Sequence, residues 1–158
     1  MKYKIIEGQE FVKIKKEIQK AKAIGEIPLV VIEDDSLLRK FSENEKNIFL
    51  ATKLKDRKDK LYQRDSGFDD VTLKFMAKNN IAMAIILDEL INNSNSLMVK
   101  AKILARIKQN IKIARKKKTR IKLIILDEKL RKDEKDLLSL LVIMEADTKT
   151  AKQASEIN

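Results

Sequence analysis

Apolar, β-branched segments alternate with longer amphipathic segments along this chain. The apolar segments predict five strands, at Lys2–Glu7, Pro28–Glu33, Asn47–Thr52, Ile81–Leu87 and Arg120–Leu126. The amphipathic segments predict six helices, at Glu10–Ile24, Asp35–Phe41, Ser66–Lys78, Leu97–Lys118, Glu134–Met144 and Lys149–Ser155. Strands that alternate with helices run parallel and are joined by right-handed crossovers. The sequence therefore predicts an α/β fold with a parallel sheet.

The number of strands limits which parallel fold is possible. A closed eight-stranded barrel needs roughly 200 residues or more, and this chain has 158. We expect parallel β/α units that form a reduced or incomplete TIM-barrel-like fold, with residues 1–158 as one domain. The composition, 44% hydrophobic and 37% charged, is typical of a soluble globular protein.

Two missing residue types exclude several classes of site. The chain has no cysteine and no histidine, which excludes disulfides, a Ser-His-Asp triad and the usual zinc sites. No apolar run is long enough to cross a bilayer, and Met1–Glu10 lacks the pattern of a signal peptide. We expect a cytoplasmic protein that does not bind a membrane.

The positive charge is concentrated in the segment Leu97–Leu126, which contains no acidic residue. Its eleven basic residues are Lys100, Lys102, Arg106, Lys108, Lys112, Arg115, Lys116, Lys117, Lys118, Arg120 and Lys122. The formal charge of the whole chain is +11, so the other residues sum to zero. A localised positive charge favours polyanions because binding releases condensed counterions. The alternative is a solvated helix face in a lysine-rich protein.

The predicted helix Leu97–Lys118 has an apolar stripe formed by Leu97, Ala101, Ile103, Leu104, Ile107, Ile111 and Ala114. Lys102, Arg106 and Gln109 are expected on the opposite face, pointing away from the sheet. Cations in the last turn also complement the helix dipole, so that role is an equally good explanation for Lys116, Lys117 or Lys118 taken singly. If about six basic residues meet phosphates, affinity falls with salt at a log–log slope of about −4 to −5.

The segment Lys53–Arg64 is polar and is expected to be an exposed loop. Ser66 follows it, with Asp69 three residues later, and this spacing predicts a capping box in which Ser66 caps the next helix. Arg64 could reach a phosphate or a partner carboxylate at that helix N-terminus.

Acidic residues follow the predicted strands, at Glu7, Glu33, Asp34, Asp88, Glu89, Asp127 and Glu128. Active sites of parallel α/β folds gather at this edge of the sheet, and carboxylates there could hold Mg²⁺ for phosphoryl transfer. Acidic residues are also favoured at helix N-termini, which follow strands in this topology. Capping is the preferred interpretation because no spacing motif links these residues. An enzyme of this kind stays as an alternative.

Three segments resemble one known family, the protein component 3 (p-thirty) subunit of archaeal ribonuclease P. Arg64–Val71 (RDSGFDDV), which leads into Ala77–Ala82, is similar to the family's Arg-x-Ser-Gly-hydrophobic-Asn/Asp-x-Val motif. Ala101–Lys116 resembles its basic helix, and Asp136–Leu140 its Asp-Leu-x-Ser-Leu segment. The resemblance runs from Val30 to Ala154. The N-terminal part looks shorter than in most members, and Asp127-Glu128 stands where they often have a Ser/Gly-rich turn.

The resemblance implies a non-catalytic subunit of ribonuclease P, which removes the 5′ leader of precursor tRNA. Catalysis would belong to the RNA subunit with its Mg²⁺, and this chain would bind no metal or cofactor. Its implied partners are ribonuclease P RNA and protein component 2, with precursor tRNA reached indirectly. The family motif residues are Arg64, Ser66, Gly67, Asp69 and Val71. The RNA-binding candidates are Arg64, Lys102, Arg106, Lys108, Lys112, Arg115, Lys116, Lys117, Lys118, Arg120 and Lys122. A general RNA-binding protein unrelated to tRNA is the other alternative.

Overall fold

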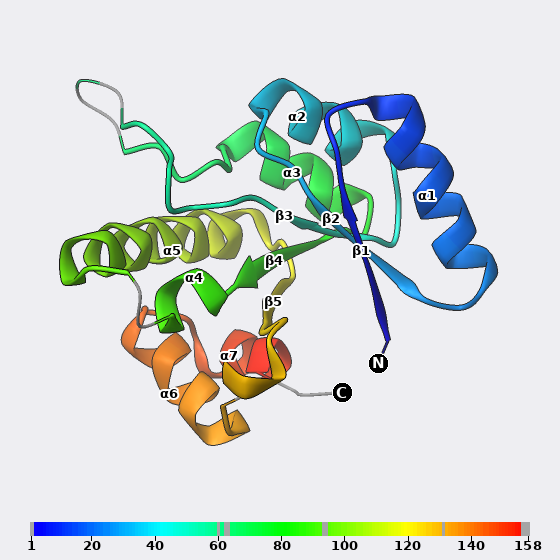
Figure 1. The fold of residues 1–158 in the computed structure, drawn as a ribbon. Coiled ribbons are helices and arrows are strands. Elements are labelled where there is room, and N and C mark those ends of the chain that lie inside the picture. Colours follow the sequence, from blue (N-terminus) through cyan, green and yellow to red (C-terminus); the bar gives the residue numbers. More distant parts are fainter. Residues whose placement is uncertain (1, 60, 62–63, 93–94, 131, 156–158) are drawn as a thin grey trace.

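The computed structural model describes residues 2–59, 61, 64–92, 95–130 and 132–155, and Figure 1 shows their arrangement. The strands are β1 (Tyr3–Glu7), β2 (Ile27–Val31), β3 (Phe49–Ala51), β4 (Ala82–Ile86) and β5 (Ile121–Ile124). All five lie inside or within one residue of the predicted segments. The strand predictions are therefore confirmed, with β3 and β5 shorter than expected.

The helices also follow the predicted order. They are α1 (Phe11–Ala23), α2 (Asp35–Asn44), α3 (Asp70–Lys78), α4 (Asp88–Ile91), α5 (Leu97–Lys117), the 3-10 helix η1 (Glu128–Leu130), α6 (Glu134–Ile143) and α7 (Thr148–Ser155). The sequence did not predict α4 or η1, because each is too short to show a helical period. In the described ranges, no helix is long and apolar enough to cross a membrane.

The strands form one parallel sheet in the order β1-β2-β3-β4-β5, so each strand pairs with its neighbours in the sequence. This confirms the predicted α/β class with parallel strands. The sheet is not closed, because β1 and β5 do not pair with each other. In Figure 1, α1, α2 and α3 lie on one side of the sheet, while α6 and α7 lie below it beside β5.

The two faces of the sheet are buried in different ways. On one face, strand residues such as Val30, Leu50 and Met83 pack with helix residues, including Phe41 of α2 and Ile107 of α5. The buried residues of the other face all come from strands: Leu29, Val31, Phe49, Ala51, Ala82, Ala84 and Ile124. Burial on both faces explains why these strands are continuous apolar runs rather than alternating ones.

Helix α3 begins later than predicted, and Ser66 does not cap it. The N-cap is Asp69, whose carboxylate accepts a hydrogen bond from the Thr72 N–H at 2.7 Å. The predicted capping box is therefore wrong. Ser66 is buried, and its Oγ has no hydrogen-bond partner among the residues that the structure describes. Asp69 is the N-cap instead of Ser66. An aspartate carboxylate accepts hydrogen bonds from helix N–H groups as well as a serine hydroxyl does, and Asp69 lies one turn closer to the apolar part of the helix.

Candidate nucleic-acid interface

Helix α5 carries most of the candidate residues and buries only part of one face. Its buried residues are Ile103, Arg106, Ile107, Asn110, Ile111 and Ala114. The first turn projects beyond the core, so Leu97 is 86% exposed and Ala101 is also exposed. The prediction that these two residues belong to the packed stripe is wrong, although the stripe holds from Ile103 onward.

Arg106 is the main departure from the predicted interface. The sequence placed it on the outer face, but its side chain is only 2% exposed. Its guanidinium donates hydrogen bonds to the carbonyl oxygens of Leu54 and Arg57, both at 2.6 Å, and to that of Lys55 at 3.4 Å. It also pairs with the Asp59 carboxylate at 3.0 Å, and this bond lowers the pKa of Asp59. We therefore remove Arg106 from the exposed cations.

The loop that covers Arg106 is less exposed than predicted. Leu54 is buried, and the Arg57 side chain is only 8% exposed. Arg57 donates to the carboxylates of Asp35 and Asp65, the latter at 2.9 Å, and to Thr52 Oγ1 at 3.0 Å. Two arginines thus fix this loop against α5 and the carboxyl ends of the strands. The sequence showed only a polar, charged segment, so it gave no signal for this role.

Besides Arg106, three candidate cations are paired with acidic residues. Lys108 Nζ lies 2.7 Å from the Glu145 carboxylate, and Lys117 Nζ lies 2.8 Å from that of Asp70. Arg115 Nε lies 3.4 Å from an oxygen of Asp147. The hydrogen bond from Lys108 and its charge lower the pKa of Glu145. Exposed ion pairs such as Lys108–Glu145 contribute little to stability, about 0–1 kcal/mol, so a stronger anion can displace them.

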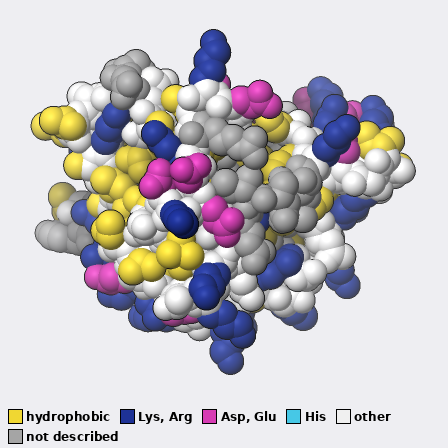
Figure 2. Space-filling view, turned by 90° about the horizontal axis from the view of Figure 1, so that it is seen from below, with side chains coloured by type: hydrophobic (Ala, Val, Ile, Leu, Met, Phe, Trp, Pro, Cys, Tyr) yellow, Lys and Arg dark blue, Asp and Glu magenta, His cyan; other side chains and the backbone are white. Residues whose placement is uncertain are grey.

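The other candidates on α5 and after it are exposed, apart from Lys122. Exposed side chains without an ion pair in the described part of the chain are Lys102, Lys112, Lys116, Lys118 and Arg120. Arg64 is exposed as well, and its carbonyl oxygen accepts a hydrogen bond from Gln109 at 3.2 Å. Figure 2 shows Lys and Arg side chains around much of the outline of the molecule seen from below, with acidic side chains in fewer places.

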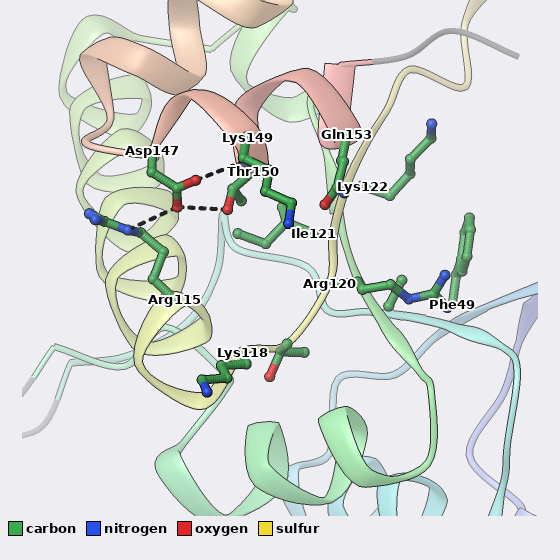
Figure 3. Close-up of a pocket in the computed structure, with 12 residues that line it drawn as sticks. Phe49, Arg115, Lys118, Arg120, Ile121, Lys122, Asp147, Lys149, Thr150 and Gln153 are labelled. Atoms are coloured by element: carbon green, nitrogen blue, oxygen red, sulfur yellow. Dashed lines mark hydrogen bonds and ion pairs between the residues drawn. The ribbon is translucent and has the colours of Figure 1, made fainter.

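A cavity of about 630 Å³ opens where α5 ends, β5 begins and α7 passes beside them. We call it the basic pocket. Its charged lining residues are Arg115, Lys118, Arg120, Lys122, Lys149 and Asp147. Figure 3 shows their side chains arranged around the open space, with Phe49 on the side of Arg120. Lys122 is only 8% exposed, so it lines this cavity and does not extend an outer surface as predicted.

The basic pocket lies at the amino-terminal edge of the sheet. Helices in a parallel α/β fold end at this edge, so the negative ends of their dipoles point to it. Basic residues stand in the last turns of α1 (Lys20 and Lys22), α3 (Lys78) and α5 (Arg115, Lys116 and Lys117). The helix dipole is therefore a sufficient explanation for the basic residues in the last turn of each of these helices. The additional cations on β5 and α7 lie outside any helix C-terminus facing this edge.

Lys118 adopts a backbone conformation that favours glycine. Its φ is +57° at the C-cap of α5, where a non-glycine residue costs roughly 1 kcal/mol. We expect Lys118→Gly to raise the free energy of unfolding by about 0.5–1 kcal/mol, measured by urea denaturation. Lys116→Gly is the control: it lies inside α5, so glycine there is expected to lower stability by about 0.5–1 kcal/mol. If the two glycine variants both raise or both lower the free energy of unfolding, this interpretation is contradicted.

The carboxylates that follow the strands act mainly as acceptors for backbone N–H groups. Asp34 caps α2 by accepting from the Leu37 N–H at 2.7 Å, as the capping interpretation predicted. Asp88 instead accepts from the N–H groups of Leu126 and Asp127, and so joins the ends of β4 and β5. Glu89 accepts from Leu54 and Lys55, both at 3.1 Å. In the described part of the chain, no three acidic residues form a group that could hold a metal ion.

The motif residues Arg64, Ser66, Gly67, Asp69 and Val71 lie at the turn before α3. Gly67 has a φ of +82°. The Ser66 carbonyl accepts from Asn110 Nδ2 at 3.0 Å, which connects the turn to α5. Val71 is 41% exposed. Of these residues, only Arg64 presents a charged, exposed side chain suited to an anionic ligand.

Comparison with known proteins shows a similarity of fold. The sequence matches no family model and no curated protein. The structure is similar to a chain of the cryo-EM structure of archaeal Ribonuclease P with mature tRNA, with a TM-score of 0.77 and 19% sequence identity. The match covers 96% of this chain and 63% of that chain. This chain therefore spans less than two thirds of the length of its structural neighbour, and the likeness concerns the fold.

Proposed function

We propose that this chain is a protein subunit of ribonuclease P, related to protein component 3, and that its sheet is part of an incomplete TIM-like barrel. The single observation that carries this proposal is the fold similarity, at a TM-score of 0.77 over 96% of the chain. The motif at Arg64–Val71 supports it independently, because that resemblance rests on the sequence alone. The chain would act in the cytoplasm and would leave catalysis to the RNA subunit with its Mg²⁺.

The proposed RNA contact is to the phosphate backbone. The exposed cations of α5 and of the turn before β5 are long, flexible side chains, and the helix places Lys102, Lys112 and Lys116 along one outer arc. Such side chains neutralise phosphates and position the RNA but do not read bases. The proposed protein partner is component 2, as the resemblance implies.

The salt dependence of RNA binding tests the backbone contact. With Arg106 buried, five exposed cations without an ion pair in the described part of the chain remain on α5 and in the turn before β5. About five phosphate contacts give a log–log slope of roughly −3.5 to −4.5. We expect this slope for the catalytic RNA in filter-binding or anisotropy titrations. Changing Lys102, Lys112 and Lys116 to Glu should flatten it by about 2–3 units, whereas a flat slope in the unchanged protein would refute the contact.

Cleavage of precursor tRNA tests the function itself. The assay uses the cognate catalytic RNA with protein component 2 at limiting Mg²⁺, with and without this chain. We expect stimulation that requires both proteins. A basic subunit lowers the electrostatic repulsion between RNA phosphates, which Mg²⁺ would otherwise have to screen. The triple Glu variant described above should lose most of the stimulation while keeping its fold.

The same assay separates the alternatives. Absence of stimulation with a folded component 2 would exclude the proposed subunit. RNA binding with the salt dependence above would then indicate a general RNA-binding protein. Cleavage by this chain without the catalytic RNA, lost in Asp88→Asn or Asp127→Asn, would instead indicate the Mg²⁺-dependent enzyme.

A further inference from the structure

The basic pocket differs from the rest of the positive surface because it combines charge with depth and an apolar floor. It lies at the amino-terminal ends of β3, β4 and β5, and its apolar lining residues are Phe49, Ala82 and Ile121. The exposed lysines of α5 stand on a convex helix and could only touch a passing backbone. A cavity of about 630 Å³ can enclose a small ligand.

The charge of the pocket is strongly unbalanced. Five cations line it against one carboxylate, whereas the whole chain has 35 basic and 24 acidic residues. That carboxylate, Asp147, is already occupied: it accepts from the Thr150 N–H at 2.9 Å and Oγ1 at 2.7 Å, and it pairs with Arg115. The hydrogen bonds from Thr150 lower the pKa of Asp147.

Three of the pocket cations have charge that the described part of the chain does not neutralise. Lys118 and Lys149 are exposed side chains without an ion pair in that part. Arg120 Nη2 donates to the carbonyl oxygen of Asn80 at 3.0 Å, which orients the guanidinium but adds no negative charge. Lys118, Arg120 and Lys149 line the cavity from three different segments. In Figure 3 Lys149 points into the open space, while Lys118 and Arg120 lie on opposite sides of it. Several cations around one cavity suit an anionic ligand such as a phosphate group.

The apolar floor indicates what is attached to that phosphate. Phe49 packs against Tyr3, with ring centroids 5.7 Å apart, so its ring is held in place at the floor. A paired duplex presents only phosphates and sugars to such a cavity and would leave the floor uncovered. An unpaired nucleotide offers both a phosphate and a flat, largely apolar base.

We propose that the basic pocket binds a single unpaired nucleotide, with its phosphate among the cations that line the pocket and its base at Phe49. The nucleotide comes from a single-stranded or bulged segment of RNA or from a free nucleotide. Only the RNA source rests on the proposed function.

Two charge-matched double variants test the pocket. Lys118→Glu with Lys149→Glu changes the pocket, and Lys102→Glu with Lys112→Glu makes the same charge change on exposed positions of α5 outside it. The probes are a 5′-phosphorylated single-stranded tetranucleotide, a short RNA duplex, adenosine 5′-monophosphate and ribose 5-phosphate. Thermal unfolding by circular dichroism verifies that both variants are folded.

We expect the pocket variant to lose at least tenfold more affinity for the tetranucleotide than the surface variant. The unchanged protein should bind adenosine 5′-monophosphate at least threefold more tightly than ribose 5-phosphate, because only the former has a base for the floor. Equal losses in the two variants, tighter binding of the duplex, or equal affinity for the two monophosphates would overturn the proposal.

Nucleotide binding is measured without the other subunits, so its outcome is separate from that of the cleavage assay. Binding of adenosine 5′-monophosphate without the tetranucleotide would support the pocket and assign it to free nucleotides. Pocket binding without stimulation of precursor tRNA cleavage would leave the pocket in place and exclude the ribonuclease P subunit.

Discussion

Arg106→Met is expected to lower the free energy of unfolding by about 3 kcal/mol. Methionine keeps the apolar stem of the arginine but removes its bonds to the carbonyls of Leu54 and Arg57, both 2.6 Å long, and to Asp59. Each carbonyl that loses its donor and stays buried costs about 1–3 kcal/mol. Removing the buried charge offsets part of this loss, because its desolvation also disappears. Urea denaturation measures the difference.

The control for Arg106→Met is Lys102→Met, one turn earlier on α5. Lys102 is exposed, so its replacement should change stability by no more than about 0.5 kcal/mol. Hydrogen exchange adds a local readout at Leu54 and Lys55, whose N–H groups donate to Glu89 at 3.1 Å. We expect these two amides to exchange faster in Arg106→Met only. A stability within 0.5 kcal/mol of the unchanged protein would show that Arg106 does not hold the loop.

Gly67→Ala is expected to lower the free energy of unfolding by about 2–4 kcal/mol. Gly67 has a φ of +82°, and a Cβ atom there would lie 2.5 Å from Thr52 Cγ2 and 3.0 Å from Arg57 Cζ. The backbone conformation accounts for about 1 kcal/mol of the loss. The steric clash accounts for the rest, because the hydrogen bonds of Arg57 prevent its side chain from moving away.

Gly25→Ala separates the two causes. Gly25 has a φ of +75°, but no atom of a more distant residue lies within 4 Å of the position of an added Cβ. Since only Gly25 itself and its two chain neighbours come that close, this variant reports the backbone cost alone, and we expect a loss of about 1 kcal/mol. Thermal or urea unfolding of both variants gives the comparison. If Gly67→Ala costs no more than Gly25→Ala, the close approach of Thr52 and Arg57 to the turn does not contribute to stability.

The positions of the strands were predictable because the pattern of apolar residues depends only on local sequence. Runs such as Pro28–Ile32 are apolar at every position, as is typical of strands buried on both faces. The segment that holds the excess of positive charge was also predictable, because the charge of a segment follows directly from its own residues. The short helices α4 and η1 were not, because three or four residues do not complete a recognisable period.

The capping error at Ser66 has a different cause. Ser66 and Asp69 are both good N-cap residues, so the sequence allowed two helix starts. The structure selects Asp69, because the turn before α3 is packed under the loop and bonded to Asn110.

The sequence by itself determined that the chain forms parallel β/α units and that one helix and the strand after it hold the excess of positive charge. The tertiary structure alone decided which of those cations are available. On α5, Arg106 lies at the rim of the buried arc, and the loop that packs there decides whether it faces solvent or carbonyl oxygens. The basic pocket likewise joins residues of β3, β5 and α7, which are separated by up to about a hundred positions in the sequence and meet only when the sheet is formed. Local periodicity fixes each element, but only packing between distant elements fixes a site.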